Sequence, residues 1–415
     1  MKKSVSIALI LATGVIIAIG IAWFLRPDIS ENKYTSATAS LEAGDTLEAL
    51  NLAEKAIAWN KNNTDAWLLK GKILFYTRNY QGAIEALNTT IALNDSLTEA
   101  WFLKGSVHME TDSLELAMEE LNKAISLTDS FAAAWYKRGI LKANQDDYTG
   151  SVADYRKAIA LGYSGTKILE QTADINLLLE DYTAAIGNYN QILMVDPENT
   201  EAFRKRGYFK LQLKDYPAAL EDFNKAIELD DSDALTFYHR ATSRSGMGQY
   251  QEALEDYIKS IEIDPANAKA FYNRGLTYMN LQEYTKAKQD FEASLKLDES
   301  AKTWHMLGLA MAISGKHAAS IQPFNNAIKS DKTNAQYYFH RGISKGVLGR
   351  HQEAIEDYSI AIKLNPKNAE AWFNRGISRL NTQNTEEGCK DFNTALSLGH
   401  EQAQQMIKMY CGLYK

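Results

Sequence analysis

The stretch that decides the fold runs from Ala335 to Asn368, AQYYFHRGISKGVLGRHQEAIEDYSIAIKLNPKN. Bulky side chains such as Tyr338 and Tyr358 recur in it at helical spacing, which predicts two amphipathic helices joined by a short turn. The pair Asn365-Pro366 ends the second helix, because proline lacks an N–H and disfavours α geometry in the residue before it. One such hairpin cannot bury its own apolar face, so it must stack on a copy of itself.

The 34-residue pattern recurs from Ser30 to Gln402. With Ala335 as position 1, Gly342 is position 8 and Ala354 is position 20, and all eleven units have glycine, alanine or serine at both. A larger side chain would force the two helices apart at a cost of ~1–3 kcal/mol. The units start at Ser30, Thr64, Thr98, Ala132, Thr166, Thr200, Ala234, Ala268, Ala301, Ala335 and Ala369.

These units resemble tetratricopeptide repeats in three features. A large aromatic residue at position 4 matches the family, as at Trp67, Trp101, Trp135 and Trp372, and so do the turn tyrosines and the closing Asp/Asn-Pro pairs. The resemblance implies an all-α solenoid, a right-handed superhelix of about eleven helix-turn-helix repeats whose first helices line a concave groove. It also implies a surface that binds protein or peptide.

Composition agrees with an all-α chain and disfavours one class of partner. The sequence lacks alternating strand patterns and has only six prolines. Its net charge of −7 repels phosphate backbones, so no nucleic acid partner is expected.

The first 29 residues form a separate segment. Val5–Leu25 is 21 residues without a charge, about the length that an α-helix needs to cross a bilayer, and Lys2 and Lys3 precede it. The sequence therefore predicts a single-pass anchor in a bacterial cytoplasmic membrane, a short linker over residues 26–29, and repeats on the periplasmic side. A cleaved signal peptide, giving a secreted protein, is the alternative.

A second regularity joins the two helices of a unit. Arginine stands at position 7 in six units, and the same six units have aspartate at position 23. The arginine is missing at Thr172 and Leu307, where the aspartate is replaced by Asn188 and Pro323. This joint presence and absence predicts contacts that align the helices more than they add net stability. The predicted ion pairs are Arg138–Asp154, Arg206–Asp222, Arg240–Asp256, Arg274–Asp290, Arg341–Asp357 and Arg375–Asp391.

Two units depart from the pattern, and the array needs a cap. Gly162 and Gly165 precede the fifth unit, and Pro323 stands inside the second helix of the ninth, so each marks either a bend or tolerated drift. Residues 30–402 form the repeat array, and His400–Leu413 predicts a capping helix, with residues 403–415 beyond the array. Ala403, Met406, Ile407, Tyr410 and Leu413 share its apolar face.

Cys389 and Cys411 are the only cysteines, and a turn at Gly399 brings them level. We predict a disulfide between them, with two buried thiols as the alternative. The seven histidines show no metal-ligand spacing, and no phosphate-binding or catalytic motif is present. No metal or cofactor is therefore expected. No enzymatic activity is expected either, since only 13 residues follow Gln402.

The groove is where the sequence points for function. Position 5 of the first helices carries an aromatic stripe, and aromatic anchors in a concavity are favoured for binding. These residues either bind a partner or pack against a neighbouring second helix: Phe102, Tyr136, Tyr238, Tyr272, Phe339 and Phe373. The Hsp70/Hsp90-type carboxylate clamp of the family is not expected, because three of its five positions depart from the pattern. The five clamp positions hold Arg204, Tyr208, His239, Lys269 and Asn273.

The sequence therefore predicts a non-enzymatic, membrane-tethered scaffold or adaptor that gathers protein or peptide partners. A periplasmic chaperone-like binder of unfolded or peptide clients is the second possibility.

Overall fold

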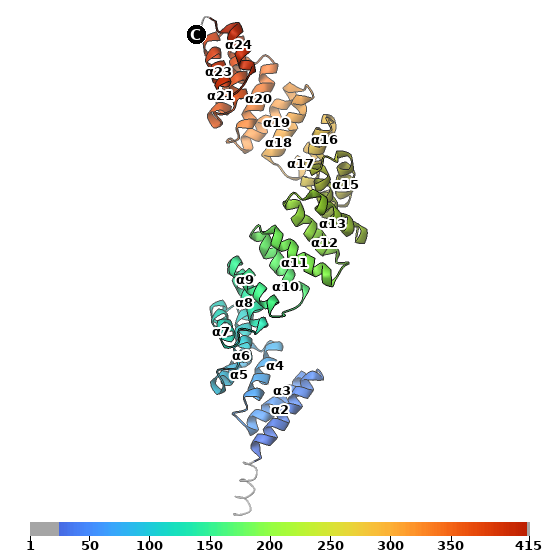
Figure 1. The fold of residues 1–415 in the computed structure, drawn as a ribbon, viewed down its shortest axis with the longest axis vertical. Helices are drawn as coiled ribbons and strands as arrows, with labels where there is room; N and C mark the ends of the chain where they lie inside the picture. Colours follow the sequence, from blue (N-terminus) through green and yellow to red (C-terminus); the bar gives the residue numbers. More distant parts are fainter. Residues whose placement is uncertain (1–24, 413–415) are drawn as a thin grey trace, which may run out of the picture. The chain divides into compact units, whose positions relative to one another are not determined.

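Each unit forms a helix pair joined by a tight turn in the computed structural model, which describes residues 25–412 (Figure 1). No strand occurs among these residues, so the fold is an all-α solenoid of helix-turn-helix repeats. The first helices are α2 Arg26–Glu42, α4 Thr64–Tyr76, α6 Thr98–Glu110, α8 Ala132–Asn144, α10 Thr166–Leu178, α12 Thr200–Gln212, α14 Ala234–Gly246, α16 Ala268–Asn280, α18 Ala301–Ile313, α20 Ala335–Val347 and α22 Ala369–Asn381.

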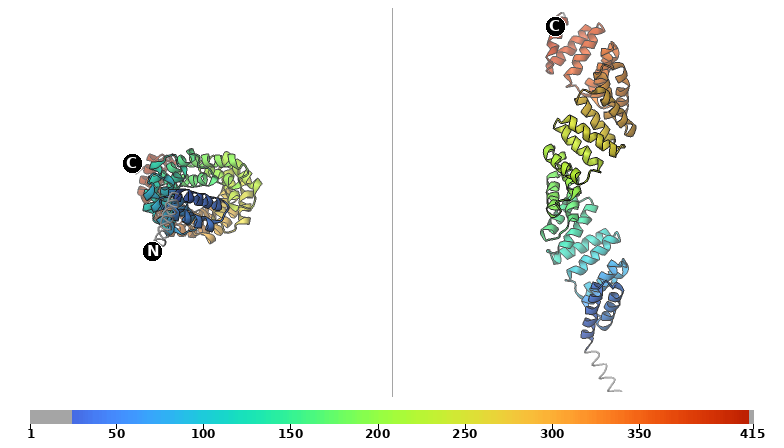
Figure 2. Two further views of the ribbon diagram at one scale, coloured as in Figure 1. Left: turned by 90° about the horizontal axis from the view of Figure 1, so that it is seen from below. Right: turned by 90° about the vertical axis from the view of Figure 1, so that its right-hand side faces the viewer.

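The second helices follow after three-residue turns. They are α3 Thr46–Trp59, α5 Tyr80–Leu93, α7 Leu114–Leu127, α9 Tyr148–Ala160, α11 Tyr182–Val195, α13 Tyr216–Leu229, α15 Tyr250–Ile263, α17 Tyr284–Leu297, α19 His317–Ser330, α21 His351–Leu364 and α23 Thr385–Ser397, and α24 Gln402–Tyr410 follows the last pair. Figure 2 shows the side-by-side pairing within the hairpins from two further directions.

The turns share one backbone conformation. The residue at position 15 has a left-handed φ in every repeat, and it is glycine in only four of them, as at Gly349 with φ 73°. The other repeats place a side chain there, for example Arg78 with φ 60°. Some helix starts are capped by side chains: Asn63 accepts from the Ala66 N–H at 2.9 Å, and Asp147 accepts from the Gly150 N–H at 2.9 Å.

Position 8 is small because a ring lies against it. A Cβ added to Gly342 would stand 2.8 Å from the Tyr358 ring, and one added to Gly308 would stand 2.6 Å from the Phe324 ring. Real carbon atoms do not approach so closely, so glycine there lets the ring at position 24 fill the space between the two helices.

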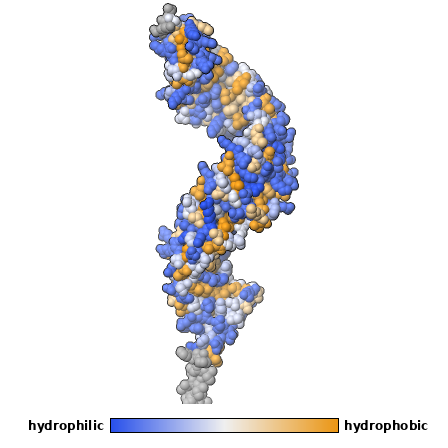
Figure 3. Space-filling model, in the orientation of Figure 1, coloured by the Kyte–Doolittle hydropathy of each residue, from blue (hydrophilic) through white to orange (hydrophobic). Residues whose placement is uncertain are grey.

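The chain divides into two compact parts, Met1–Gln191 and Ile192–Lys415, each of which contains several repeats. Within each, the alanine at position 20 and the apolar residues around it form small clusters between neighbouring hairpins. Hydrophilic residues cover most of the face seen in Figure 3, and hydrophobic residues lie there in scattered patches.

The residues that depart from the repeat pattern lie within a continuous helix or in a loop between helices. The α19 helix continues through Pro323, which is buried. Gly162 and Gly165, with φ 87° and 132°, occupy the loop between α9 and α10. Residues 26–29, predicted as a linker, form the first turn of α2.

The last helix covers the end of the array. Ala403, Met406 and Ile407 pack on a cluster that includes Phe373 and Phe392, as expected of a cap. Tyr410, which the sequence places on the same face, is 51% exposed, because α24 ends there.

The predicted single-pass location in a bacterial cytoplasmic membrane is wrong on this structure. A span needs ~20 apolar residues. Within residues 25–412 no helix is both long and apolar enough, and α2, with 17 residues, is rich in polar side chains. Val5–Leu25, on which the anchor and the secreted alternative both rest, lies outside the described residues except for Leu25.

Candidate functional site

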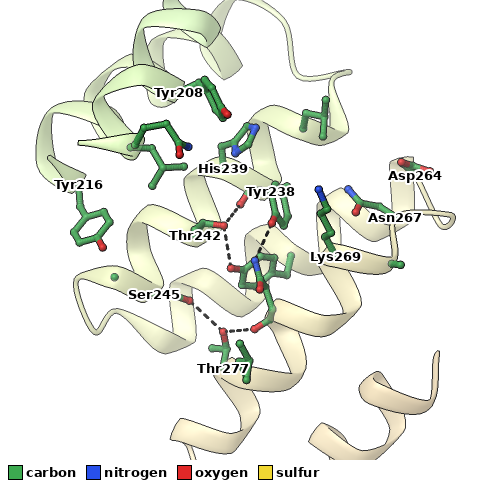
Figure 4. Close-up of a pocket in the computed structure, with 18 of the residues that line it drawn as sticks. Tyr208, Tyr216, Tyr238, His239, Thr242, Ser245, Asp264, Asn267, Lys269 and Thr277 are labelled. Atoms are coloured by element: carbon green, nitrogen blue, oxygen red, sulfur yellow. Dashed lines mark hydrogen bonds between the residues drawn. The ribbon is translucent and has the colours of Figure 1, made fainter. Parts of the chain in front are cut away.

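A cavity lies beside three consecutive first helices in the part of the chain from Ile192 to Lys415. Its volume is about 1100 Å³, and residues of α12, α14 and α16 form most of its lining (Figure 4). We call it the α12–α16 groove. The lining includes Tyr208, Leu211, Gln212, Leu235, Tyr238, His239, Thr242, Ser245, Lys269, Asn273, Leu276, Thr277 and Asn280.

The repeat explains this lining. The residues stand at positions 2, 5, 6, 9, 10, 12 and 13 of their helices, which share one side of an α-helix. Because consecutive first helices present the same side, three copies of the pattern combine into one surface.

Hydrogen bonds between neighbouring helices order the floor of the groove. The Asn273 side-chain amide donates to the Tyr238 hydroxyl at 2.9 Å, and the Ser245 and Thr277 hydroxyls lie 3.1 Å apart, so both contacts join α14 to α16 (Figure 4). Burial raises the pKa of Tyr238, which keeps its hydroxyl neutral. The floor is therefore polar, uncharged and fixed in place.

The rim carries apolar and charged side chains. Leu235 is 52% exposed at the start of α14. Lys269, in the first turn of α16, has no ion pair among the described contacts, and its side chain extends beside Tyr238 (Figure 4). Asp264 and Asp298 also line the groove, so the rim offers both signs of charge.

His239 stands between this groove and a smaller cavity of about 320 Å³. Its ring lies 5.2 Å from the Tyr208 ring, and its Nδ1 is buried without a hydrogen-bond partner. Burial lowers the pKa of His239 to about 4, so the imidazole is neutral near neutral pH.

The five positions that the family uses for its carboxylate clamp all line these two cavities, but Arg204 is already engaged. It donates to Asp230 at 2.6 Å and lies 3.6 Å from Asp233. Hydrogen bonds from Ser232 and Arg204 lower the pKa of Asp230 to about 2, so it stays ionised. With Arg204 committed and rings at Tyr208 and His239, the absence of a clamp stays our prediction.

The aromatic stripe at position 5 packs mainly inside its own hairpins. The Tyr136, Phe339 and Phe373 side chains are at most 9% exposed. Ring centroids at positions 5 and 24 lie 5.7 to 6.1 Å apart in the pairs Tyr136–Tyr155, Tyr238–Tyr257, Tyr272–Phe291, Phe339–Tyr358 and Phe373–Phe392. Phe102 is half-buried and contacts Phe131, 5.1 Å away. Of the six, Tyr238 alone lines the α12–α16 groove.

The structure brings together each arginine and aspartate of the six predicted pairs. In each pair the arginine Nε and one terminal nitrogen donate to the two carboxylate oxygens, as Arg375 does to Asp391 at 2.9 and 2.8 Å. The aspartates are at most 5% exposed. The remaining nitrogens of Arg138, Arg240, Arg341 and Arg375 reach position 25 of the preceding second helix, at Asn122, Asn224, Asn325 and Ser359 respectively.

Sequence reasoning missed a third member of these clusters. A basic residue at position 11 contacts the same aspartate in five of the six hairpins, through Lys142, Lys210, Arg244, Lys345 and Arg379. It stands four residues after the arginine, one helical turn away, so the pattern was readable. A related cluster in the third repeat joins Lys104 and His108 to Glu120, at 2.8 and 2.7 Å.

Cys389 and Cys411 are joined in a disulfide that ties the end of α24 to α23. Across residues 25–412, no group of three or more histidine, cysteine or acidic side chains is arranged to hold a metal ion.

Family comparison addresses the repeats directly. Models described as tetratricopeptide repeat match residues 40–104, 98–131, 171–234 and 268–300, and one described as TPR repeat matches 247–282 and 348–382. Together they cover more than half of the chain. The chain belongs to the tetratricopeptide repeat family.

Solved structures of other tetratricopeptide repeat proteins are similar to parts of this one. A structure from Cytophaga hutchinsonii is 16% identical with a TM-score of 0.50, over 58% of this chain and 99% of its own, and it shows the fold alone. A structure from Parabacteroides merdae is 22% identical over 60% of this chain and 99% of its own, with a TM-score of 0.44. YrrB, described as a TPR protein with an unusual peptide-binding site, is 25% identical over 45% of this chain and 98% of its own, with a TM-score of 0.42. No curated protein matches the chain.

Proposed function

We propose that this tetratricopeptide repeat protein is a non-enzymatic interaction scaffold that holds a protein or peptide segment in the α12–α16 groove. The continuity of the groove across three consecutive first helices carries the proposal. A surface that extends over several stacked repeats, here with a volume of about 1100 Å³, suits a length of polypeptide.

The groups in the groove fit such a segment. Leu235 offers exposed apolar surface, and Tyr208 adds an aromatic anchor of the kind enriched at binding hot spots. Gln212 and Asn280 each offer an amide that can both donate to and accept from a peptide backbone. Lys269 adds a cation without a fixed partner.

A chaperone-like binder of many unfolded clients would use the same groove differently, because it would capture many proteins weakly. Nothing in the described residues favours that alternative over one dedicated partner, and the experiment below separates the two.

The test is photo-crosslinking in the cells that make the protein, with the photoreactive amino acid at Leu235. The matched control is Ile258, on the second helix of the same hairpin. Both side chains are apolar and similarly exposed, at 52% and 40%, but Ile258 does not line the groove. Adducts would be identified by mass spectrometry and the binding repeated with purified proteins.

The proposal predicts one dominant protein adduct at position 235 that is absent at 258. It also predicts that Leu235→Glu weakens binding of the purified partner by at least ~10-fold, while Ile258→Glu leaves it unchanged. Many unrelated adducts at 235 would favour the chaperone. Equal adducts at the two positions, or equal effects of the two substitutions, would exclude the groove as the binding surface.

A further inference from the structure

Three polar contacts cross between consecutive first helices at one register, from position 5 of one repeat to position 6 of the next. The Tyr136 hydroxyl donates to Gln171 at 2.8 Å, and the Tyr238 hydroxyl accepts from Asn273 at 2.9 Å. The third contact joins two imidazoles, His305 Nε2 and His340 Nδ1, 2.9 Å apart. Of these three contacts, only the last joins two groups that take up protons in mildly acidic solution.

Aromatic rings surround the imidazole pair. The His305 ring lies 4.9 Å from Tyr337 and 5.9 Å from Phe324, and the His340 ring lies 5.2 Å from Phe339. Burial lowers the pKa of His305 to about 4, with a contribution from His340, and burial also lowers the pKa of His340. These surroundings favour the neutral imidazoles.

A tyrosine is a titratable neighbour of the pair. Tyr337 on α20 packs on His305. Besides burial, Asp331 in the loop before α20 contributes to the raised pKa of Tyr337, and Tyr337 contributes to the raised pKa of Tyr272 on α16. The pKa values of both tyrosines are raised by burial, so their hydroxyls stay neutral.

Several charged groups of the helices packed around α18 and α20 have partners of their own. Asp357 on α21 is paired with Arg341 and Lys345. Asp290 on α17 is paired with Arg274. The α19 helix contributes the uncharged Phe324 ring. On α22, Arg375 is paired with Asp391, and Glu370 lies 3.4 Å from His400. The pKa of His305 is set by burial and by His340, and that of His340 by burial and by the backbone, with no contribution from a carboxylate of the described residues.

We propose that the His305–His340 contact is an acid-operated latch between α18 and α20. With both rings neutral, one N–H donates to the lone pair of the other ring. One added proton still leaves an N–H facing a lone pair, so the contact survives. A second proton puts N–H against N–H and two positive charges side by side, and the contact must break.

The lowered pKa values determine whether the folding stability rises or falls with pH. The unfolded chain binds these protons near the ordinary histidine value of ~6.5, well above the folded value. The contact therefore contributes its full stability above ~6.5, and the contribution is lost as the pH falls toward the folded pKa of about 4.

The test uses the full chain and a variant with a graft from its own sequence. The double substitution His305→Tyr and His340→Asn installs the Tyr238–Asn273 pair at the same register, without titratable imidazoles. Urea unfolding midpoints would be measured at about pH 7.5 and about pH 4.5 for both proteins. His239 is present in both and cancels in the comparison.

The latch predicts that the wild-type midpoint falls more between the two pH values than that of the variant. NMR of the histidine Cε1–H groups should show His305 and His340 titrating together in two steps, both below the ordinary value. Equal falls in the two proteins, or two independent titrations near ~6.5, would overturn the proposal.

A second set of three variants keeps the proposal testable if the graft fails to fold at about pH 7.5. His305→Gln, His340→Gln and their double variant form a cycle whose coupling can be measured at each pH value. The first proton enters the folded pair only near pH 4 and leaves the contact intact, so the latch predicts a coupling that is present at about pH 7.5 and about pH 4.5 and is lost at about pH 3. No coupling at about pH 7.5, or a coupling that persists at about pH 3, would contradict it.

Discussion

Two consecutive hairpins, α18–α19 and α20–α21, pack their two helices together in the same way but differ in the side chains that join the helices. Both place glycine against a ring, Gly308 on Phe324 and Gly342 on Tyr358. At positions 7 and 23, however, α20–α21 has the buried pair Arg341–Asp357, whereas α18–α19 has Leu307 and a proline, both buried.

The comparison teaches that the ion pair is not needed to close a hairpin. The ion pair instead fixes how neighbouring helices are oriented. Arg341 donates two hydrogen bonds to Asp357 and a third to Asn325 of the preceding α19, at 2.6 Å. One side chain thus aligns α19, α20 and α21. We propose that the six pairs serve alignment, since replacing a buried pair by apolar residues is often neutral while breaking one is costly.

The largest expected effect comes from breaking the pair on one side. Asp357→Ala leaves Arg341 and Lys345, which are 17% and 10% exposed, without their buried carboxylate. We expect a loss of ~3–5 kcal/mol in the free energy of unfolding, measured by urea denaturation.

The control makes α20–α21 resemble α18–α19. Adding Arg341→Leu to Asp357→Ala removes the uncompensated guanidinium and installs the residue found at 307. We expect it to recover most of the loss. A double variant as unstable as Asp357→Ala would mean that the pair contributes net stability rather than alignment.

The disulfide ties α24 to α23 by a covalent bond in addition to side-chain packing. The Cys389–Cys411 bridge closes a loop with a sequence separation of 22, for which the chain-entropy model gives ~3 kcal/mol. Cys389→Ala with Cys411→Ala should lower the free energy of unfolding by about that amount. Both thiols of the denatured protein should resist labelling until reductant is added, and full labelling without reductant would contradict the bridge.

The smallest expected effects come from the glycine–ring contact that the two hairpins share. A Cβ at Gly342 would meet the Tyr358 ring at 2.8 Å, so Gly342→Ala should cost ~1–3 kcal/mol. Gly308→Ala should cost a similar amount, because the ring contact is the same with or without an ion pair.

Gly346, one turn later on α20, is the matched control. Its nearest neighbour for an added Cβ is the Tyr358 hydroxyl at 3.5 Å, an ordinary contact. Gly346→Ala should stabilise by up to ~1 kcal/mol through helix propensity, as measured by thermal or urea unfolding. If both alanine variants behave alike, the ring does not explain the glycine.

The sequence alone was enough for the features that depend on spacing along one hairpin. The 34-residue period, the small residues at positions 8 and 20 and the Arg–Asp pairing all follow from helix geometry, which brings residues 16 apart, such as Arg341 and Asp357, face to face. Since every unit repeats the constraint, eleven copies made the pattern visible.

Contacts between repeats were decided by the tertiary structure. The sequence left open whether position 5 binds a partner or packs, and the structure turns Tyr136, Phe339 and Phe373 into the hairpins, since rings at position 24 lie within reach. It also set the α12–α16 groove and the His305–His340 contact, which joins residues 35 apart on different repeats. Such contacts depend on how one hairpin is offset and rotated against the next, and no spacing within a single hairpin encodes that.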